Sequence, residues 1–157
     1  MIKRNQKTVL FAALALLCTA FIFSNSFKNV EASRADSDVI VEIVEKLDNK
    51  VTPNHDLAWN DIVRKGAHFA EFCILGILTA LLWLQICPRR KATVAFAFAY
   101  VTAVAFIDEW IQRFTGRGSQ LKDVGIDVLG AYIGIALVLL LWCGIRYMKR
   151  GPRQART

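Results

Sequence analysis

The chain has 157 residues, of which 55% are hydrophobic, and its formal net charge at pH 7 is +7. With a mean hydropathy of +0.37 and long apolar runs, this composition excludes an ordinary soluble domain. The positive charge does not indicate nucleic-acid binding, because eleven of the twenty Lys and Arg residues lie in three short segments that flank the apolar runs.

The first apolar window covers residues 8–27 and follows the basic segment MIKRNQK. A bilayer core about 30 Å thick requires roughly 20 apolar residues in a helix, so this window is long enough to span it. We interpret residues 1–27 as an uncleaved N-terminal membrane anchor. The alternative is a secretory signal peptide that is cleaved after Ala32, and it leaves the later spans oriented in the same way.

Residues 28–61 form a polar loop with four basic and eight acidic residues. Within it, residues 36–49 place apolar side chains at helical spacing, and Pro53 ends the pattern. We predict a short amphipathic helix in this loop. It either lies at the membrane interface or acts as a lid over the outer surface.

Three further apolar windows follow, at residues 66–86, 92–111 and 124–145. Together the four windows predict an all-α fold, a multi-pass transmembrane bundle of four helices. Residues 62–145 form its three-span core, and residues 146–157 form a basic tail.

The distribution of charge predicts the orientation of these spans. Three segments together hold eleven basic residues and no acidic ones: residues 1–7, the link CPRRK at residues 87–91 and the tail. Because basic residues stay preferentially on the cytoplasmic side, we predict that both termini and the link are cytoplasmic and that the loop of residues 28–61 is extracytoplasmic. The chain is then a multi-pass protein of the cell membrane that contacts membrane lipids.

Every acidic residue that follows Asp61 lies near the predicted outer end of a span. At about 100° per residue, helical periodicity groups these acids and their polar neighbours on one side of each helix. The group on the second span is Lys65, His68 and Glu71, and the group on the third span is Asp108, Glu109 and Gln112.

The last span continues this layer. Asp123 and Asp127 fall on the same narrow stripe as Gly130 and Gly134. Two glycines four residues apart allow helices to approach closely, and a packing stripe faces the interior of the bundle. We therefore expect Asp127 to face inward and to meet His68 and Asp108 in one cavity.

The loop TGRGSQ at residues 115–120 places Arg117 between two glycines, just before the last span. Free backbone amides at a helix N-terminus attract anions. A phosphate or carboxylate could therefore bind beside Arg117 and Lys65. The alternative is a tight connecting loop that binds nothing.

Charged side chains at this depth in a membrane are costly, by roughly 2.5–3.5 kcal/mol each at a helix centre. The polar layer therefore has one of two explanations. It is either an outward-facing site for a polar ligand or an internal salt-bridge network that holds three helices together.

Four stretches, in their order and spacing, resemble the VanZ-like family of membrane proteins: RKGAHFAEFCILG, DEWIQ, TGRGSQLKDVGIDVLG and AYIG. The resemblance covers about residues 62–135. Two positions depart from the family pattern: Phe72, where Tyr is frequent, and Thr115, where Pro often precedes the Gly-Arg pair. The pattern falls on Lys65, His68, Asp108, Glu109, Gln112, Arg117, Asp123, Asp127 and Gly130.

The resemblance implies a small multi-pass protein of the bacterial cell membrane. The family's namesake is associated with low-level resistance to teicoplanin, a glycopeptide that binds cell-wall precursors outside the membrane. The first function to consider is therefore binding: the polar site would hold a lipid headgroup, a lipid-linked cell-wall precursor or the antibiotic, and would modulate the sensitivity of the envelope.

Two other functions stay open. In an intramembrane enzyme acting on an envelope lipid or glycan, His68 would be a base, Asp108 or Glu109 an acid or metal ligand, and Arg117 a clamp for an oxyanion or phosphate. In a structural scaffold, the charges would only connect the helices. We assign no metal ligands and name no cofactor, and the sequence leaves open whether a divalent metal binds.

Overall fold

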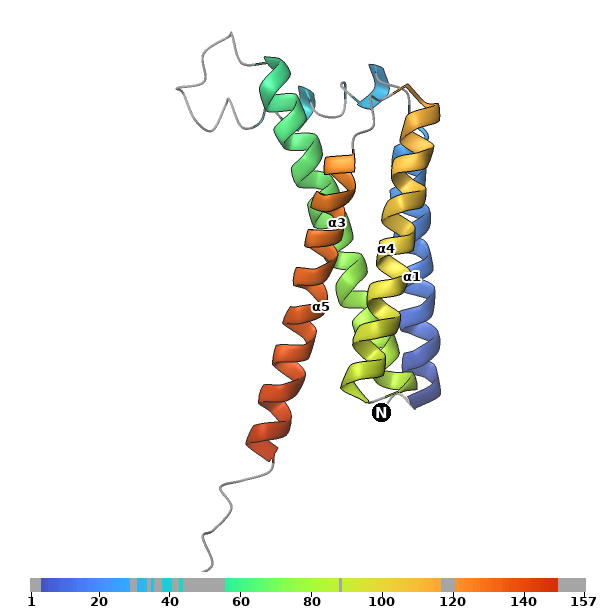
Figure 1. The fold of residues 1–157 in the computed structure, drawn as a ribbon, viewed down its shortest axis with the longest axis vertical. Helices are drawn as coiled ribbons and strands as arrows, with labels where there is room; N and C mark the ends of the chain where they lie inside the picture. Colours follow the sequence, from blue (N-terminus) through green and yellow to red (C-terminus); the bar gives the residue numbers. More distant parts are fainter. Residues whose placement is uncertain are drawn as a thin grey trace, which may run out of the picture.

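The structure is a computed structural model, and it describes residues 4–28, 31–33, 35, 38–40, 43, 56–87, 89–116 and 121–149. The described residues form four long helices that run up and down beside one another (Figure 1). They are α1 (Arg4–Ser26), α3 (Asp56–Ile86), α4 (Arg90–Phe114) and α5 (Leu121–Lys149).

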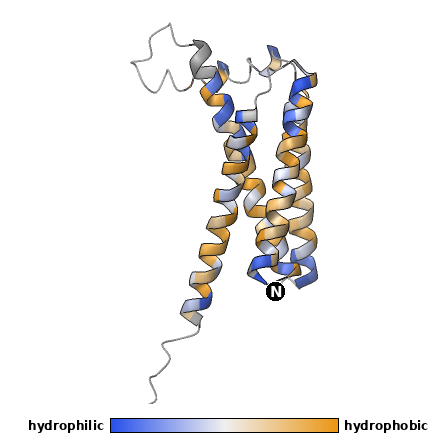
Figure 2. Ribbon diagram, viewed as in Figure 1, coloured by the Kyte–Doolittle hydropathy of each residue, from blue (hydrophilic) through white to orange (hydrophobic). Residues whose placement is uncertain are grey.

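All four helices are long and apolar enough to cross a membrane. The prediction of an all-α, four-span bundle is therefore confirmed. Each helix extends past the apolar window that predicted it, and α3 begins ten residues earlier, at Asp56 instead of residue 66. A hydropathy window marks only the part that is apolar, whereas helical hydrogen bonding continues into polar residues. Figure 2 shows hydrophilic residues at the ends of the helices and apolar residues along their middle.

The ends of the helices fall on two levels. One end of the bundle holds the start of α1, the link between α3 and α4 and the end of α5 (Figure 1). The opposite end, where α1 finishes and α3 begins, is called the loop end below. This arrangement has the alternating direction that the charge pattern requires, while the side of the membrane that each end faces stays a prediction. Most of the predicted amphipathic helix of residues 36–49 lies outside the described residues.

Small residues bring α3 and α5 into close contact. A Cβ atom added at Gly130 would meet the backbone carbonyl oxygen of Phe69, and one added at Gly134 would meet that of Cys73. In the same way, a Cβ atom at Gly76 would meet the carbonyl oxygen of Ala131. The GxxxG pair on α5 therefore packs against α3, as such spacing predicts. Gly76, the matching residue on α3, was not predicted.

The interior of the bundle is apolar below the loop end. Phe72, Leu75, Val101 and Ile135 are buried between the helices. Many large apolar side chains face outward instead, among them Leu16, Leu17, Leu140 and Leu141. A soluble protein rarely exposes apolar surface on this scale, whereas the outward side chains of a membrane bundle contact lipid tails.

Candidate functional site: a polar cluster at the loop end

Asp108 on α4 is the most enclosed acid of the cluster, with no exposed surface. The Ser26 hydroxyl, at the end of α1, donates a hydrogen bond to Asp108 Oδ1 at 2.5 Å. The Gln112 amide, one turn further along α4, donates to Asp108 Oδ2 at 2.6 Å. Each oxygen of the carboxylate thus has a donor, and the two hydrogen bonds fix its orientation.

Glu71 on α3 is held from the same side. Asn25, next to Ser26 on α1, donates a hydrogen bond from its Nδ2 to Glu71 Oε1 at 2.9 Å. Two adjacent residues of α1 therefore reach an acid on α3 and an acid on α4. The first helix is part of the polar cluster and not only an anchor.

His68 lies among three carboxylates. Its Nδ1 is 3.8 Å from Asp108 Oδ2 and 4.0 Å from Glu71 Oε2. His68, Asp108 and Asp127 each place one nitrogen or oxygen atom within 4.8 Å of the other two. Three different helices, α3, α4 and α5, thus bring one side chain each to a common point.

Glu109 is a second buried acid on α4, with 4% of its surface exposed. Neither of its carboxylate oxygens has a hydrogen-bond partner among the described residues. Its charge lies within electrostatic range of Asp127, as do the charges of Asp108, Asp123 and Glu71. A buried carboxylate without a partner is unfavourable and suggests that a partner is supplied from elsewhere.

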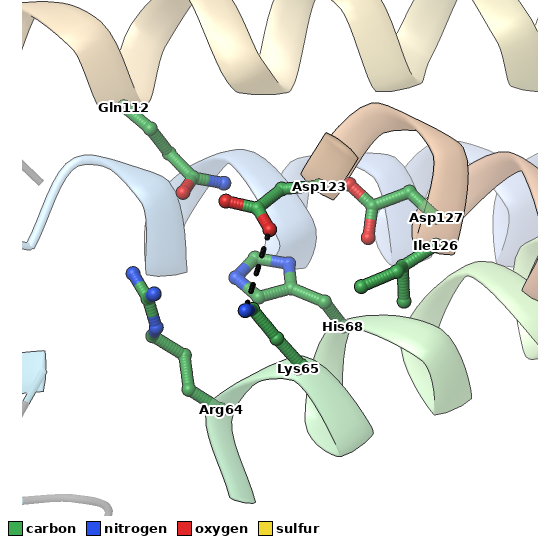
Figure 3. Close-up of a pocket in the computed structure, with 7 residues that line it drawn as sticks. All are labelled: Arg64, Lys65, His68, Gln112, Asp123, Ile126 and Asp127. Carbon is green, nitrogen blue, oxygen red and sulfur yellow. Dashed lines mark ion pairs between the residues drawn. The ribbon is translucent and has the colours of Figure 1, made fainter. Parts of the chain in front are cut away.

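A pocket opens between α3, α4 and α5 at this level (Figure 3). Its internal volume is about 10 Å³, which is enough for roughly one water molecule. Asp127 is only 2% exposed, so it lies at the deep end. The other lining residues are Arg64, Lys65, His68, Gln112, Asp123 and Ile126.

The rim of the pocket carries partly exposed ion pairs. Asp61 contacts Arg64 at 2.7 Å and Lys65 at 2.6 Å. Lys65 Nζ also lies 3.9 Å from Asp123, the contact drawn in Figure 3. The side chain of Lys65 is 38% exposed, and that of Asp61 is 44% exposed. The mouth of the pocket therefore carries charges of both signs, whereas its deep end is acidic.

The structure thus separates the predicted residues into three groups. It brings Lys65, His68, Glu71, Asp108, Glu109, Gln112, Asp123 and Asp127 to the loop end. It places Gly130 and Gly134 in the contact of α5 with α3. Arg117 lies outside the described residues, together with the rest of residues 117–120.

Three residues of this site were missed from the sequence: Asn25, Ser26 and Arg64. Asn25 and Ser26 belong to the triplet SNS at the end of the first window. A polar triplet there reads as the end of a span, because nothing in the sequence shows which helices α1 will contact. Arg64 stands beside Lys65 in the stretch RKGAHFAEF and could have been included on that ground.

A comparison with protein families finds one family that matches most of the chain. The family described as VanZ/LLP1 matches residues 10–142. The chain belongs to the VanZ/LLP1 family. No curated protein and no solved structure matches it.

The family match is wider than the stretch of residues 62–135 on which the resemblance rested. It includes most of α1 and the loop that follows. This extent agrees with the contacts of Asn25 and Ser26, which join α1 to the polar cluster. The protein is a multi-pass membrane protein of the VanZ/LLP1 family in which all four helices form one unit.

Proposed function

We propose that the pocket at the loop end binds a polar headgroup from the outer face of the membrane, that of an envelope lipid or a lipid-linked cell-wall precursor. Binding there would change how the envelope responds to glycopeptides such as teicoplanin. The observation that carries the proposal is the pocket itself, a polar opening lined from three helices whose remaining surface is apolar.

A buried acid without a hydrogen-bond partner, Glu109, supports ligand binding over a purely structural network. A network that only connects helices gains by pairing its buried charges, since an unpaired buried charge is strongly destabilising. Glu109 is buried, and neither of its oxygens has a hydrogen-bond partner among the described residues. A site that awaits a ligand has a reason to leave such groups without partners.

The order of charges in the pocket supports a ligand that carries both signs. Arg64 and Lys65 stand at the mouth, where an anionic phosphate would meet them. The acids at the deep end, Asp127 above all, would receive a cationic group. The small volume of the pocket implies that only the tip of a ligand enters, while the rest stays at the membrane surface.

The predicted orientation supports contact with wall-directed agents. If the termini are cytoplasmic, the loop end faces outward, at the depth where lipid-linked precursors carry their headgroups. The resemblance to the VanZ-like family adds the association of its namesake with teicoplanin resistance. The described helices leave no large soluble domain, so the target must come to the membrane surface.

An intramembrane enzyme is the second candidate, and the position of His68 favours it. His68 lies 3.8 Å from Asp108, and a histidine oriented by a carboxylate can act as a general base. The substitution His68→Gln distinguishes the two functions. An enzyme with this substitution would still bind its ligand but would lose catalysis. A binding protein would lose both ligand binding and its effect on the envelope.

The experiment has two arms. In the first, single cysteines are placed at Lys46, Gln120 and Arg90 in a cysteine-free variant and labelled in intact cells with a membrane-impermeant reagent. We expect labelling at the first two positions and none at Arg90. Labelling of Arg90 would place the pocket on the cytoplasmic side and would contradict the proposal.

In the second arm, the protein is expressed in a teicoplanin-sensitive Gram-positive host, and the inhibitory concentration of teicoplanin is measured. Wild type should raise this concentration. Asp108→Asn should abolish the rise, because it removes a charge from the deep end. Asp38→Asn, the same substitution at an exposed acid of the loop, should have no effect. Equal protection by all three at matched protein levels would exclude the polar cluster as the cause.

A further inference from the structure

We infer that His68, Asp108 and Asp127 form a binding site for one divalent metal ion at the deep end of the pocket. This inference goes beyond the headgroup site proposed above. It also revises the expectation from the sequence, in which no metal ligand was assigned. It can be tested with the ion alone, so it can fail or succeed without the proposed function.

The geometry of the three side chains suits a metal. Their donor atoms lie within 4.8 Å of one another. A point equidistant from three atoms at that separation is about 2.8 Å from each of them, and bonds to zinc or calcium are about 2.0–2.6 Å long. A movement of less than about 1 Å of each side chain would therefore bring all three into coordination.

The surroundings hold one of these ligands in place. Ser26 and Gln112 each donate a hydrogen bond to a different oxygen of Asp108. A carboxylate oxygen has two lone pairs, so Asp108 can still bind a cation. Hydrogen bonds of this kind orient metal ligands and affect the affinity of a site by 10–100-fold.

The site is also rich in acids. Glu71, Asp108, Glu109 and Asp127 lie close together. Carboxylate oxygens are common ligands of divalent metal ions, so this composition favours a cation at this position.

Two deeply buried carboxylates provide separate evidence for a ligand. Glu109 is 4% exposed, and both of its oxygens are without a hydrogen-bond partner in the described part of the chain. Asp127 is 2% exposed and lines the pocket, and in Figure 3 its carboxylate lies beside the ring of His68. No described residue donates a hydrogen bond to Asp127. A metal ion would provide both carboxylates with the positive partner that they lack.

The types of donor atom and the volume of the pocket indicate which metal ions can bind. One imidazole with two carboxylates is a donor set for Zn²⁺ or Mn²⁺, whereas Mg²⁺ and Ca²⁺ prefer oxygen ligands alone. The volume of about 10 Å³ holds a single ion of this size. An ion at this position would also offer an open coordination position to the mouth of the pocket.

The test uses the full chain, purified in detergent and stripped of metal with a chelator. Zn²⁺ and Mn²⁺ are each titrated in a calorimeter, and the metal retained after gel filtration is measured by mass spectrometry. We expect wild type to bind one ion per chain. Asp127→Asn and His68→Gln should each weaken binding at least about tenfold. Asp38→Asn, the same substitution at an exposed acid of the loop after α1, should leave binding within about twofold of wild type.

Thermal unfolding of the same samples separates loss of the site from loss of the fold. In chelator, Asp127→Asn should be at least as stable as wild type, because it replaces a buried acid among other acids with a neutral group of the same shape. Added metal should raise the unfolding temperature of wild type and of Asp38→Asn, and not that of Asp127→Asn. No binding by wild type, or equal binding by Asp127→Asn and Asp38→Asn, would overturn the inference.

Discussion

The loop end and the glycine contact lie next to each other on α3 and α5, and they are built in opposite ways. At the glycine contact, α3 and α5 approach until backbone meets backbone at Gly76, Gly130 and Gly134. At the loop end, charged side chains line a pocket between the helices. On α5 the change occurs within one turn, between Asp127 and Gly130. The comparison indicates that the glycines fix the separation of the helices and so determine how far the acids stand from one another.

The largest effect should come from filling the glycine contact. In Gly134→Leu, the new side chain would meet the carbonyl of Cys73, and backbone cannot move aside as a flexible side chain can. We expect a loss of at least about 3 kcal/mol, the upper end of the range for overpacked sites. The measurement is the amount of folded protein in the membrane and its thermal unfolding in detergent.

Gly144→Leu is the matched control for that substitution. It makes the same change on the same helix, at a position where a Cβ atom meets nothing within 4 Å. Its protein level should equal that of wild type. If both variants accumulate normally, the close approach of α3 and α5 does not set the stability of the bundle.

A smaller effect should come from removing a donor at the loop end. Ser26→Ala leaves Asp108 Oδ1 buried without its hydrogen bond. A hydrogen bond to a charged group contributes about 1.5–3 kcal/mol, and we expect a loss in that range. The measurement is the unfolding temperature in detergent.

Ser24→Ala serves as the control, because the exposed Ser24 hydroxyl bonds only to the carbonyl of Phe21 in its own helix. It should cost less than about 0.5 kcal/mol. An equal loss in the two variants would show that α1 contributes helix stability rather than a specific bond to the cluster.

The smallest effect should come from the rim. Asp61→Asn removes the partner of Lys65 and Arg64, and all three side chains are partly exposed to solvent. Ion pairs of this kind are typically worth about 0.2–1 kcal/mol and weaken with salt. We expect a change of unfolding temperature within that range at low salt and none at high salt. A loss as large as that of Ser26→Ala would mean that the rim is part of the buried network.

The sequence predicted the parts of this molecule that depend on one helix at a time. Apolar windows identify four spans, and periodicity places His68, Asp108 and Asp127 on the inner sides of their helices. It could not predict what depends on how the helices pair. The partners of Asp108 and Glu71 come from α1, 82 and 46 residues away along the chain, and no local pattern connects them. Gly76 is a single glycine and becomes significant only once α5 is known to lie against it.

The position of Asn25 and Ser26 has a consequence for biosynthesis. Because α1 precedes α3 and α4 in the chain, these two donors are synthesised before the carboxylates that they will bind. Glu71 follows with α3, Asp108 with α4 and Asp127 last with α5, so each helix that joins the bundle adds acids to the cluster. A chain arrested before α5 would display buried acids without their final neighbour. The polar cluster thus distinguishes a completed bundle from an unfinished one.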